Sequence, residues 1–258
     1  EKATTETLHQ LMNHPGLSLI LVTGTGKLVR SVSASSTPSI GVGPGNVPAY
    51  ISPSADIAEA VKTIVESKTF DNGTVCASEQ AIITEAASSG RVRAELASLG
   101  ACFLSAEEIQ KLEALAWDAE NSTMSAAVVG LSAETIAAKA GIKVPSGTTL
   151  LIAELSGVGP EFPLSAEILA PIIAFYSCAD FKTALKRCQD IVNFGGIGHS
   201  ASIFSKDESQ IRRFAEEVPA GRILVNQGGT FGALGGMTNR LSPSLTLACG
   251  PRAGNIFS

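Results

Sequence analysis

The stretch F-D-N-G-T-V-C-A-S-E-Q, residues 70–80, decides how the rest of this chain is arranged. A polar turn, D-N-G at residues 71–73, precedes Cys76, and an apolar run, A-I-I at residues 81–83, follows it. We therefore predict that a helix ends before Cys76 and that a strand begins after it. Junctions of this kind can present a side chain to a cleft. Cys76 is a candidate catalytic thiol, and a buried packing cysteine is the alternative.

The segments outside this stretch alternate between helical and extended patterns. Residues 56–70 keep their apolar side chains at helical spacing, and residues 80–84 are typical of a strand. The alternation predicts an α/β fold with a largely parallel sheet. The other predicted strands are 17–22, 47–51, 149–154, 172–176, 201–204 and 222–225. The other predicted helices are 5–12, about 27–34, 91–99, 105–117, 132–140, 180–193 and 208–217.

Local signals mark two further features. Ser105 and Glu108 have the spacing of a capping box, which predicts the start of a helix at that point. The chain from residue 227 to 258 is rich in Gly, Ser and Pro. We expect ordered loops there, with one short strand at 245–248.

Composition limits the class of protein. The chain has 258 residues, and a hydrophobic content of 45% can supply a substantial core. Its net charge of -5 and the absence of a basic run argue against a nucleic-acid surface. The longest apolar stretches, 17–22 and 168–176, fall short of the ~20 residues that cross a bilayer. Residues 1–10 are polar and do not resemble a secretory signal, so we expect neither a membrane nor a nucleic-acid partner.

The cysteines and histidines argue against a metal site. None of the five cysteines falls in a C-x-x-C pair, and the three histidines show no metal-ligand spacing. The odd number of cysteines also argues against a disulfide framework. We therefore expect free thiols, no metal and a cytoplasmic location.

A glycine turn follows the strand predicted at 17–22, which we expect to be buried. The turn reads T-G-T-G-K at residues 23–27 and leads into a helix, an arrangement that leaves backbone N–H groups available to an anion. Lys27 and Arg30 lie close by. Val29 stands where a dinucleotide fingerprint has its third glycine, so the pattern is incomplete. An ordinary strand-to-helix turn and a phosphate site both remain open.

A second glycine segment, I-G-V-G-P-G-N at residues 40–46, has three glycines at alternate positions. Glycine permits unusual backbone dihedral angles or the close approach of a ligand. A flexible crossover between domains is the other interpretation.

Taken together, several motifs resemble the CoA-acylating aldehyde dehydrogenases, especially the acetaldehyde dehydrogenase module of bifunctional aldehyde-alcohol dehydrogenases. The resemblance implies an aldehyde dehydrogenase-like α/β fold with a largely parallel sheet. Residues 1–46 would form the C-terminal part of a Rossmann-like nucleotide-binding domain, 47–240 the catalytic domain, and 241–258 a return or oligomerisation segment. The resemblance rests on six motifs. They are the glycine turn at 23–27, the glycine segment at 40–46, S-K-T-F-D-N-G-T-V-C-A-S-E-Q at 67–80, G-G-I-G-H-S at 195–200, R-I-L-V-N at 222–226 and L-S-P-S-L-T-L-A-C-G at 241–250.

By this resemblance Cys76 is the nucleophile. It would add to the aldehyde carbonyl as a thiohemiacetal, and loss of hydride to a nicotinamide would leave a thioester on sulfur. The backbone N–H of Cys76 would help to stabilise the oxyanion. His199 is the candidate for proton transfer or for positioning the CoA thiol, and a hydrogen-bonded loop histidine is the alternative.

The resemblance also implies NAD as cofactor and CoA as co-substrate. Glu167, in E-I-L-A-P-I, matches the family's glutamate that holds the nicotinamide ribose. Without the resemblance, Glu167 would be interpreted as a surface carboxylate beside a strand. The choice between NAD and NADP stays open. The other expected cofactor-binding residues are Thr23, Gly24, Gly26, Gly41 and Gly43.

Gly41 carries the prediction of acyl transfer to CoA. Hydrolytic relatives have a glutamate at the matching place, where it activates water. The chain has no acidic residue between Glu6 and Asp56 to replace it. Without that base the thioester would survive until the CoA thiol attacks it.

The function implied is reversible, NAD-dependent, CoA-acylating oxidation of a short aldehyde, with acetaldehyde as the first choice. A homo-oligomer, dimer or higher, is also implied. Much of the family's nucleotide domain lies upstream of the point that matches Glu1, so we expect a fragment of a longer enzyme. The alternatives are a semialdehyde or acyl-phosphate reductase of the same superfamily and an inactive truncated module with an assembly role.

Overall fold

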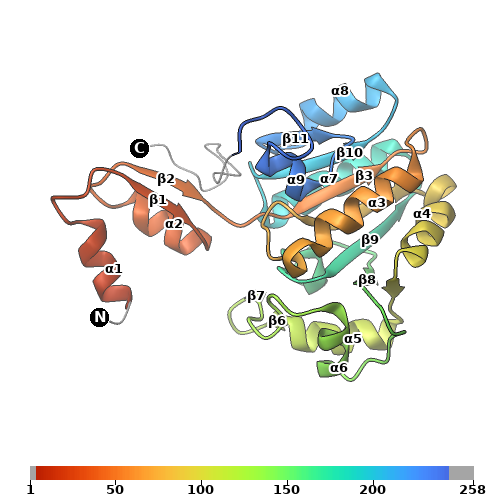
Figure 1. The fold of residues 1–258 in the computed structure, drawn as a ribbon, viewed down its shortest axis with the longest axis horizontal. Helices are drawn as coiled ribbons and strands as arrows, with labels where there is room; N and C mark the ends of the chain where they lie inside the picture. The colour runs from red at the N-terminus through yellow and green to blue at the C-terminus, as the bar shows by residue number, and fades with distance from the viewer. Residues whose placement is uncertain (1–3, 244–258) are drawn as a thin grey trace.

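A parallel sheet of seven strands forms the centre of the molecule (Figure 1). The computed structural model describes residues 4–243. The strands lie in the order β11-β10-β3-β4-β9-β8-β5, and every neighbouring pair is parallel. The α/β fold with a largely parallel sheet is therefore confirmed. The bounds are β3 Val47–Ile51, β4 Glu79–Glu85, β5 Ala101–Phe103, β8 Leu150–Glu154, β9 Ile172–Cys178, β10 Ser200–Phe204 and β11 Arg222–Val225.

Helices cover both faces of this sheet because successive side chains of each strand point to opposite faces. In β4, Ile82 belongs to the core formed with α3 and α4, whereas Ile83 belongs to the core formed with α5, α6, α7 and α8. A short helix, α9, follows the edge strand β11. The bounds are α3 Ile57–Thr69, α4 Ala86–Ser98, α5 Ala106–Ala116, α6 Ala133–Lys139, α7 Phe181–Gly195, α8 Glu208–Glu217 and α9 Gly229–Leu234.

The N-terminal part of the chain forms a second, two-stranded parallel sheet. Figure 1 shows it in red and orange, set apart from the seven-stranded sheet and joined to it by the link from β2 to β3. We call this part, residues 5–42, the N-terminal sheet. Its elements are α1 Thr5–Met12, β1 Ile20–Thr23, α2 Gly26–Ser33 and β2 Ser39–Val42.

A small antiparallel hairpin forms a separate two-stranded sheet. It consists of β6 Trp117–Asp118 and β7 Thr123–Met124, between α5 and α6. The capping box predicted at Ser105 is present, since its side chain accepts the N–H of Glu108 and the Glu108 carboxylate accepts the N–H of Ser105. Among residues 4–243 no helix is long and apolar enough to span a membrane.

One prediction about the strands is wrong. The buried strand expected at 17–22 begins only at Ile20, and its side chains are not buried: Leu19 is 49% and Leu21 is 67% exposed. Within residues 4–243, β1 pairs only with β2, and α2 is the helix that packs on this pair, so one face of β1 has no helix against it. The short elements β2, β5, β6, β7 and α9 were not predicted. The strand predicted at 245–248 lies outside the described residues.

Candidate active site

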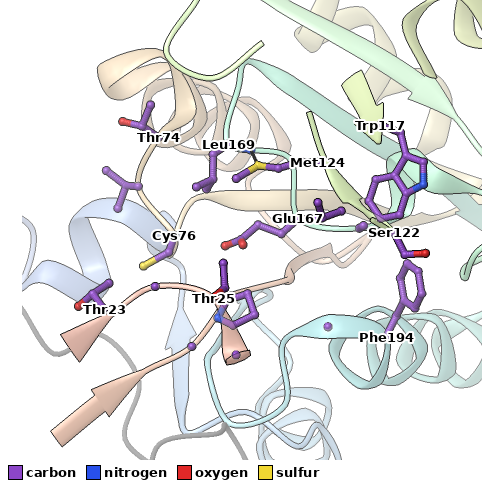
Figure 2. Close-up of a pocket in the computed structure, with 18 of the residues that line it drawn as sticks. Thr23, Thr25, Thr74, Cys76, Trp117, Ser122, Met124, Glu167, Leu169 and Phe194 are labelled. Atoms are coloured by element: carbon purple, nitrogen blue, oxygen red, sulfur yellow. Dashed lines mark hydrogen bonds between the residues drawn. The ribbon is translucent and has the colours of Figure 1, made fainter. Parts of the chain in front are cut away.

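A pocket of about 840 Å³ lies between the N-terminal sheet and the seven-stranded sheet (Figure 2). Its walls come from the turn after β1, the link between β2 and β3, the loop that carries Cys76, the hairpin β6–β7 and the end of α7. It is lined by Thr23, Gly24, Thr25, Gly26, Gly43, Pro44, Thr74, Val75, Cys76, Trp117, Ala119, Ser122, Thr123, Met124, Pro160, Ala166, Glu167, Leu169, Phe194 and Gly195.

Cys76 lies on a loop that the sequence bends sharply. After α3 ends, Asp71 and Asn72 both adopt a φ of 49°, and Gly73 follows with a φ of 74°. Residues of this kind tolerate the left-handed conformation, and the Asp71 carboxylate stabilises the turn by accepting the Thr74 hydroxyl at 2.7 Å. The helix-to-strand junction predicted around Cys76 is therefore confirmed.

Gly45 brings the link between β2 and β3 against this loop. A Cβ atom at position 45 would lie only 2.3 Å from the backbone oxygen of Cys76. Any other residue would push the two backbones apart, so the glycine is required by close approach. The same residue donates its N–H to Glu167 Oε1 at 2.8 Å. One backbone position thus contacts both the cysteine loop and the carboxylate.

Glu167 places a carboxylate beside the thiol. Figure 2 shows its side chain directed toward Cys76 across the pocket. Burial raises the pKa of Glu167 to about 7, although the N–H of Gly45 and the charge of Lys68 both favour the ionised form. Among residues 4–243, Cys76 and Glu167 are the only ionisable side chains that line the pocket.

The Cys76 thiol is protonated at neutral pH. Burial raises its pKa to about 11, and the negative charge of Glu167 contributes in the same direction. The backbone N–H groups of Cys76 and Ala77 oppose this shift because they hydrogen-bond to the sulfur. Ionisation of the sulfur therefore requires a group that removes the proton as the bond to the substrate forms.

His199 lies behind the pocket and does not line it. Its side chain is 1% exposed, and its ring lies against Gly45. Nδ1 lies 3.2 Å from the hydroxyl of Ser200, while Nε2 has no hydrogen-bond partner among the described residues. Burial, assisted by the charge of Arg222, lowers the pKa of His199 to about 4, so the ring is neutral at physiological pH.

The structure brings together most of the predicted nucleotide residues. Thr23, Gly24, Gly26 and Gly43 all line the pocket, on the wall that faces Cys76. Gly41 does not line it. A Cβ atom at Gly41 would lie 2.7 Å from Val29 Cγ1 of α2, so a side chain there would point into the N-terminal sheet.

Two groups of site residues were not found by sequence reasoning. Trp117 and Met124 form the apolar wall on the hairpin, and only the antiparallel pairing of β6 with β7 brings them there. Lys68 and Glu79 form the other group, a fully buried pair behind the cysteine loop. The sequence offered no clear signal for this group, because polar neighbours flank both residues, in S-K-T at 67–69 and S-E-Q at 78–80. In the described part of the chain, no three His, Cys, Asp or Glu side chains are grouped to hold a metal ion.

A model of the aldehyde dehydrogenase family matches residues 2–102 and 155–238. The chain therefore belongs to the aldehyde dehydrogenase family. The aldehyde-alcohol dehydrogenase 2 of Entamoeba histolytica is 38% identical over 260 residues, which cover 98% of this chain and 30% of the relative. The aldehyde-alcohol dehydrogenase of Clostridium acetobutylicum is 40% identical over 244 residues, 93% of this chain and 28% of the relative.

Solved structures agree with this family. The crystal structure of an acetylating aldehyde dehydrogenase from Geobacillus thermoglucosidasius superposes with a TM-score of 0.94 at 44% identity. The match covers 99% of this chain and 56% of that one. The chain thus spans about half of that structure and less than a third of the curated relatives. The resemblance to acylating aldehyde dehydrogenases is confirmed, and activity belongs to the proposal that follows.

Proposed function

We propose that this chain carries the acyl-transfer site of an NAD-dependent, CoA-acylating aldehyde dehydrogenase that acts on a short, uncharged aldehyde such as acetaldehyde. The observation that carries the proposal is the position of Cys76. Its thiol faces a pocket whose opposite wall is a strand, a glycine turn and the start of a helix. A reactive carbon held in this pocket would lie between the nucleophile and a nucleotide on that wall.

The residues of the glycine turn fit a nucleotide. Thr25 caps α2 by accepting the N–H of Leu28 at 3.3 Å, so the helix begins at the pocket. Lys27 and Arg30 supply positive charge on the same turn and helix, where the helix dipole also favours an anion. We assign Thr23, Gly24, Gly26, Gly43 and Glu167, which all line the pocket, to this role. NAD, when bound, would accept the hydride that leaves the substrate.

Cys76 performs the covalent steps. Its sulfur bonds to the aldehyde carbon while the carbonyl electron pair moves to oxygen, which gives a thiohemiacetal. Loss of hydride from that carbon leaves a thioester on Cys76. The thiol of CoA then attacks the thioester carbon, the bond to Cys76 breaks, and acyl-CoA leaves. The backbone N–H groups beside the sulfur are suited to stabilise the negative charge that develops.

The pocket favours an uncharged substrate. Within the described part of the chain, no Lys, Arg or His lines it. Trp117, Met124 and Phe194 supply an apolar wall, and none of the described lining residues is a cation that could neutralise an acidic substituent. A short aldehyde without charge is therefore the substrate class that the lining supports.

Hydrolysis of the thioester is the second candidate outcome, and Glu167 is the observation that favours it. A carboxylate beside Cys76 can activate water as well as a thiol. The prediction of thiolysis relied on the missing glutamate at Gly41, yet a side chain at position 41 would point toward Val29. The proposal that CoA, and not water, attacks the thioester therefore rests on the acetylating and bifunctional relatives. Analysis of the products distinguishes the two.

The test supplies the purified chain with acetaldehyde, NAD and CoA. We expect NADH formation and an acetyl group on Cys76, detected by peptide mass spectrometry when CoA is left out. Cys76→Ala should remove both signals while the circular dichroism spectrum stays the same. NADH formation that persists in Cys76→Ala would contradict the assignment.

Three further readouts separate the alternatives. Acetyl-CoA as product supports thiolysis, whereas acetate supports hydrolysis, and activity with phosphate in place of CoA supports an acyl-phosphate reductase. NAD binding can be followed by the fluorescence of Trp117, because it is the single tryptophan of the chain and it lines the pocket. A chain that neither binds NAD nor forms the thioester would be an inactive module. The homo-oligomer stays a prediction.

A further inference from the structure

We propose that Ser67, Glu79 and Thr230 are positioning residues for Cys76: they hold α9 against the loop that carries the cysteine, and α9 keeps two backbone N–H groups of that loop directed at the sulfur. The proposal deepens the function proposed above and rests on it for the reaction that Cys76 performs. We call these three residues the α9 clamp. They do not line the pocket, so their effect on the sulfur passes through the backbone.

The first turn of α9 is capped by side chains from two other elements. Gly228, which precedes the helix, has no side chain to accept its free N–H groups. The N–H of Gly229 donates instead to Glu79 Oε1 at 2.6 Å, and the N–H of Thr230 donates to Ser67 Oγ at 2.9 Å. Glu79 comes from β4 and Ser67 from α3. The clamp therefore attaches α9 to the seven-stranded sheet and to the helix that leads to Cys76.

The hydrogen bonds of the clamp support one another. The Ser67 hydroxyl donates to Glu79 Oε2 at 2.6 Å, and the Thr230 hydroxyl donates to the backbone oxygen of Ser67 at 2.9 Å. All three residues are 0% exposed. Water cannot replace a lost partner in such a place, so the loss of one hydroxyl weakens the attachment of α9.

Lys68 explains how a carboxylate can serve as the cap in this buried position. Burial raises the pKa of Glu79 to about 7, whereas the N–H of Gly229, the hydroxyl of Ser67 and the charge of Lys68 favour the ionised form. An ionised carboxylate accepts both donors, one at each oxygen. The buried lysine and glutamate thus belong to the support of α9.

α9 packs directly on the loop that carries Cys76. A Cβ atom at Gly229 would lie 2.1 Å from the backbone oxygen of Ala77, so glycine is required by this close approach. Ala77 also forms a small apolar cluster with Leu224 and Ala233, and Cys76 packs against that cluster. The helix therefore supports the residue that follows the cysteine.

α9 also contacts the turn that precedes the cysteine. The ring of Phe231 stands edge-on to the ring of Phe70, with 5.2 Å between the ring centroids. The helix thus meets the chain on both sides of Cys76 in the sequence.

The backbone held in this way carries the hydrogen bonds that act on the sulfur. The N–H groups of Cys76 and Ala77 bond to the sulfur and favour its ionised form. The turn that orients them is closed by the N–H of Ser78, which donates to Val75 O at 2.8 Å, and is backed by α9. A loosened α9 would let this turn rotate and would weaken both bonds to the sulfur.

Alkylation of Cys76 by iodoacetamide tests the clamp without NAD or CoA. The thiol loses its proton to the solvent, the Sγ–C bond forms, the C–I bond breaks and iodide leaves. The rate is measured from about pH 7 to about pH 9, where it follows the fraction of thiolate, and peptide mass spectrometry identifies the modified residue. The result stands even where the chain oxidises no aldehyde, so failure of this proposal and failure of the proposed function can be told apart.

Two substitutions of Thr230 separate the hydroxyl group from packing. Thr230→Val keeps the shape of the side chain and removes its bond to Ser67 O, and it should slow alkylation about threefold because the N–H groups favour the thiolate less. Thr230→Ser keeps the hydroxyl and loses a methyl group, and it should retain the wild-type rate. Ser67→Ala removes an acceptor and a donor together and should slow alkylation about tenfold. Where Ser67→Ala does not fold, the Thr230 pair decides.

Thr84→Val is the matched control. The Thr84 hydroxyl is also buried and donates to a backbone oxygen, that of Ile51, at 3.2 Å, but it lies near the other end of β4. Thr84→Val should lower the stability in urea about as much as Thr230→Val does and leave the alkylation rate of Cys76 unchanged.

Four results would overturn the proposal. Thr230→Val could react at the wild-type rate, or faster, which would show that the loop had only opened to the reagent. Thr230→Ser could be slowed as much as Thr230→Val, which would show that packing and not the hydroxyl matters. Thr84→Val could be slowed equally, which would show that the rate follows overall stability.

Turnover gives a second measurement where the chain forms NADH. Thr230→Val should lower kcat about threefold and leave the KM for NAD unchanged, because the clamp acts at the sulfur and does not touch the glycine turn. A raised KM for NAD with an unchanged kcat would also overturn the proposal.

Discussion

The two sheets of this molecule differ in what surrounds a strand. In the seven-stranded sheet, β8 has a strand on each side and helices on both faces, and four of its five residues are buried. In the N-terminal sheet, β1 has one neighbouring strand among the described residues, and its residues alternate between half-buried and exposed positions. Leu151 of β8 is 0% exposed, whereas Leu21 of β1 is 67% exposed.

The difference shows that an apolar run does not by itself bury its side chains. Both strands are rich in leucine, isoleucine or valine, and both pair in parallel. Burial depends on the neighbours that the rest of the chain supplies. The pocket lies where the two sheets meet, so the well-packed sheet holds Cys76 and Glu167, and the N-terminal sheet contributes only backbone and small side chains.

The same substitution in each sheet gives the largest expected contrast. Leu151→Ala should lower the free energy of unfolding by about 3 kcal/mol, because it leaves a cavity in a closed core. Leu21→Ala should lower it by about 0.5 kcal/mol or less, because the side chain is mostly in water. Urea denaturation followed by circular dichroism measures both. Equal losses in the two variants would mean that β1 is buried in solution and would remove the contrast.

Gly45→Ala tests the connection between the two sheets. The added Cβ meets the backbone oxygen of Cys76 at 2.3 Å, and backbone cannot rotate away as a side chain could. We expect a loss of about 2 kcal/mol in the free energy of unfolding, as for an overpacked core. The carboxylate of Glu167 should also shift, because its hydrogen bond comes from the same residue.

Two measurements check this variant. Urea denaturation reports the stability, and the pH profile of the rate at which iodoacetamide alkylates Cys76 reports the pocket. Gly90→Ala is the matched control, since a Cβ atom there meets nothing within 4 Å and the residue lies within α4. A Gly45→Ala chain with the stability of Gly90→Ala and a wild-type profile would contradict the close approach.

Local sequence predicted much of the fold. The helix at Thr5–Met12 and the strand at Arg222–Val225 have the bounds that their apolar patterns gave. The capping box at Ser105 was readable because all its partners lie within one turn. By contrast, β2 was missed because glycine, at position 41, has low strand propensity, and pairing with β1 forms the strand nevertheless.

The site was predictable only in part, for a physical reason. Cys76 is marked by its own neighbours in the chain, and the turn residues before it fix its conformation. Glu167 faces it from a distant segment, and that meeting depends on the order of strands in the sheet, which no local pattern records. His199 was a reasonable candidate by residue type, but burial behind Gly45 keeps it out of the pocket. The roles of all three stay proposals.

The smallest expected effect comes from Gly41, and it sharpens the contrast between the sheets. Gly41→Ala puts a Cβ atom 2.7 Å from a methyl group of Val29, which must shift. We expect a loss of about 1 kcal/mol, restricted to β1, β2 and α2, because the residue contacts only the N-terminal sheet. Hydrogen exchange should therefore show faster exchange in these elements and no change in β4 or β9.

Gly41→Glu extends this test to the chemistry. A glutamate in place of Gly41 would begin on the side of Val29, away from Cys76 and the pocket. It should therefore destabilise the N-terminal sheet more than Gly41→Ala does, without raising the ratio of acetate to acetyl-CoA among the products. An increase in acetate would show that the link between β2 and β3 can turn this side chain into the pocket. The choice between water and CoA would then be made at position 41.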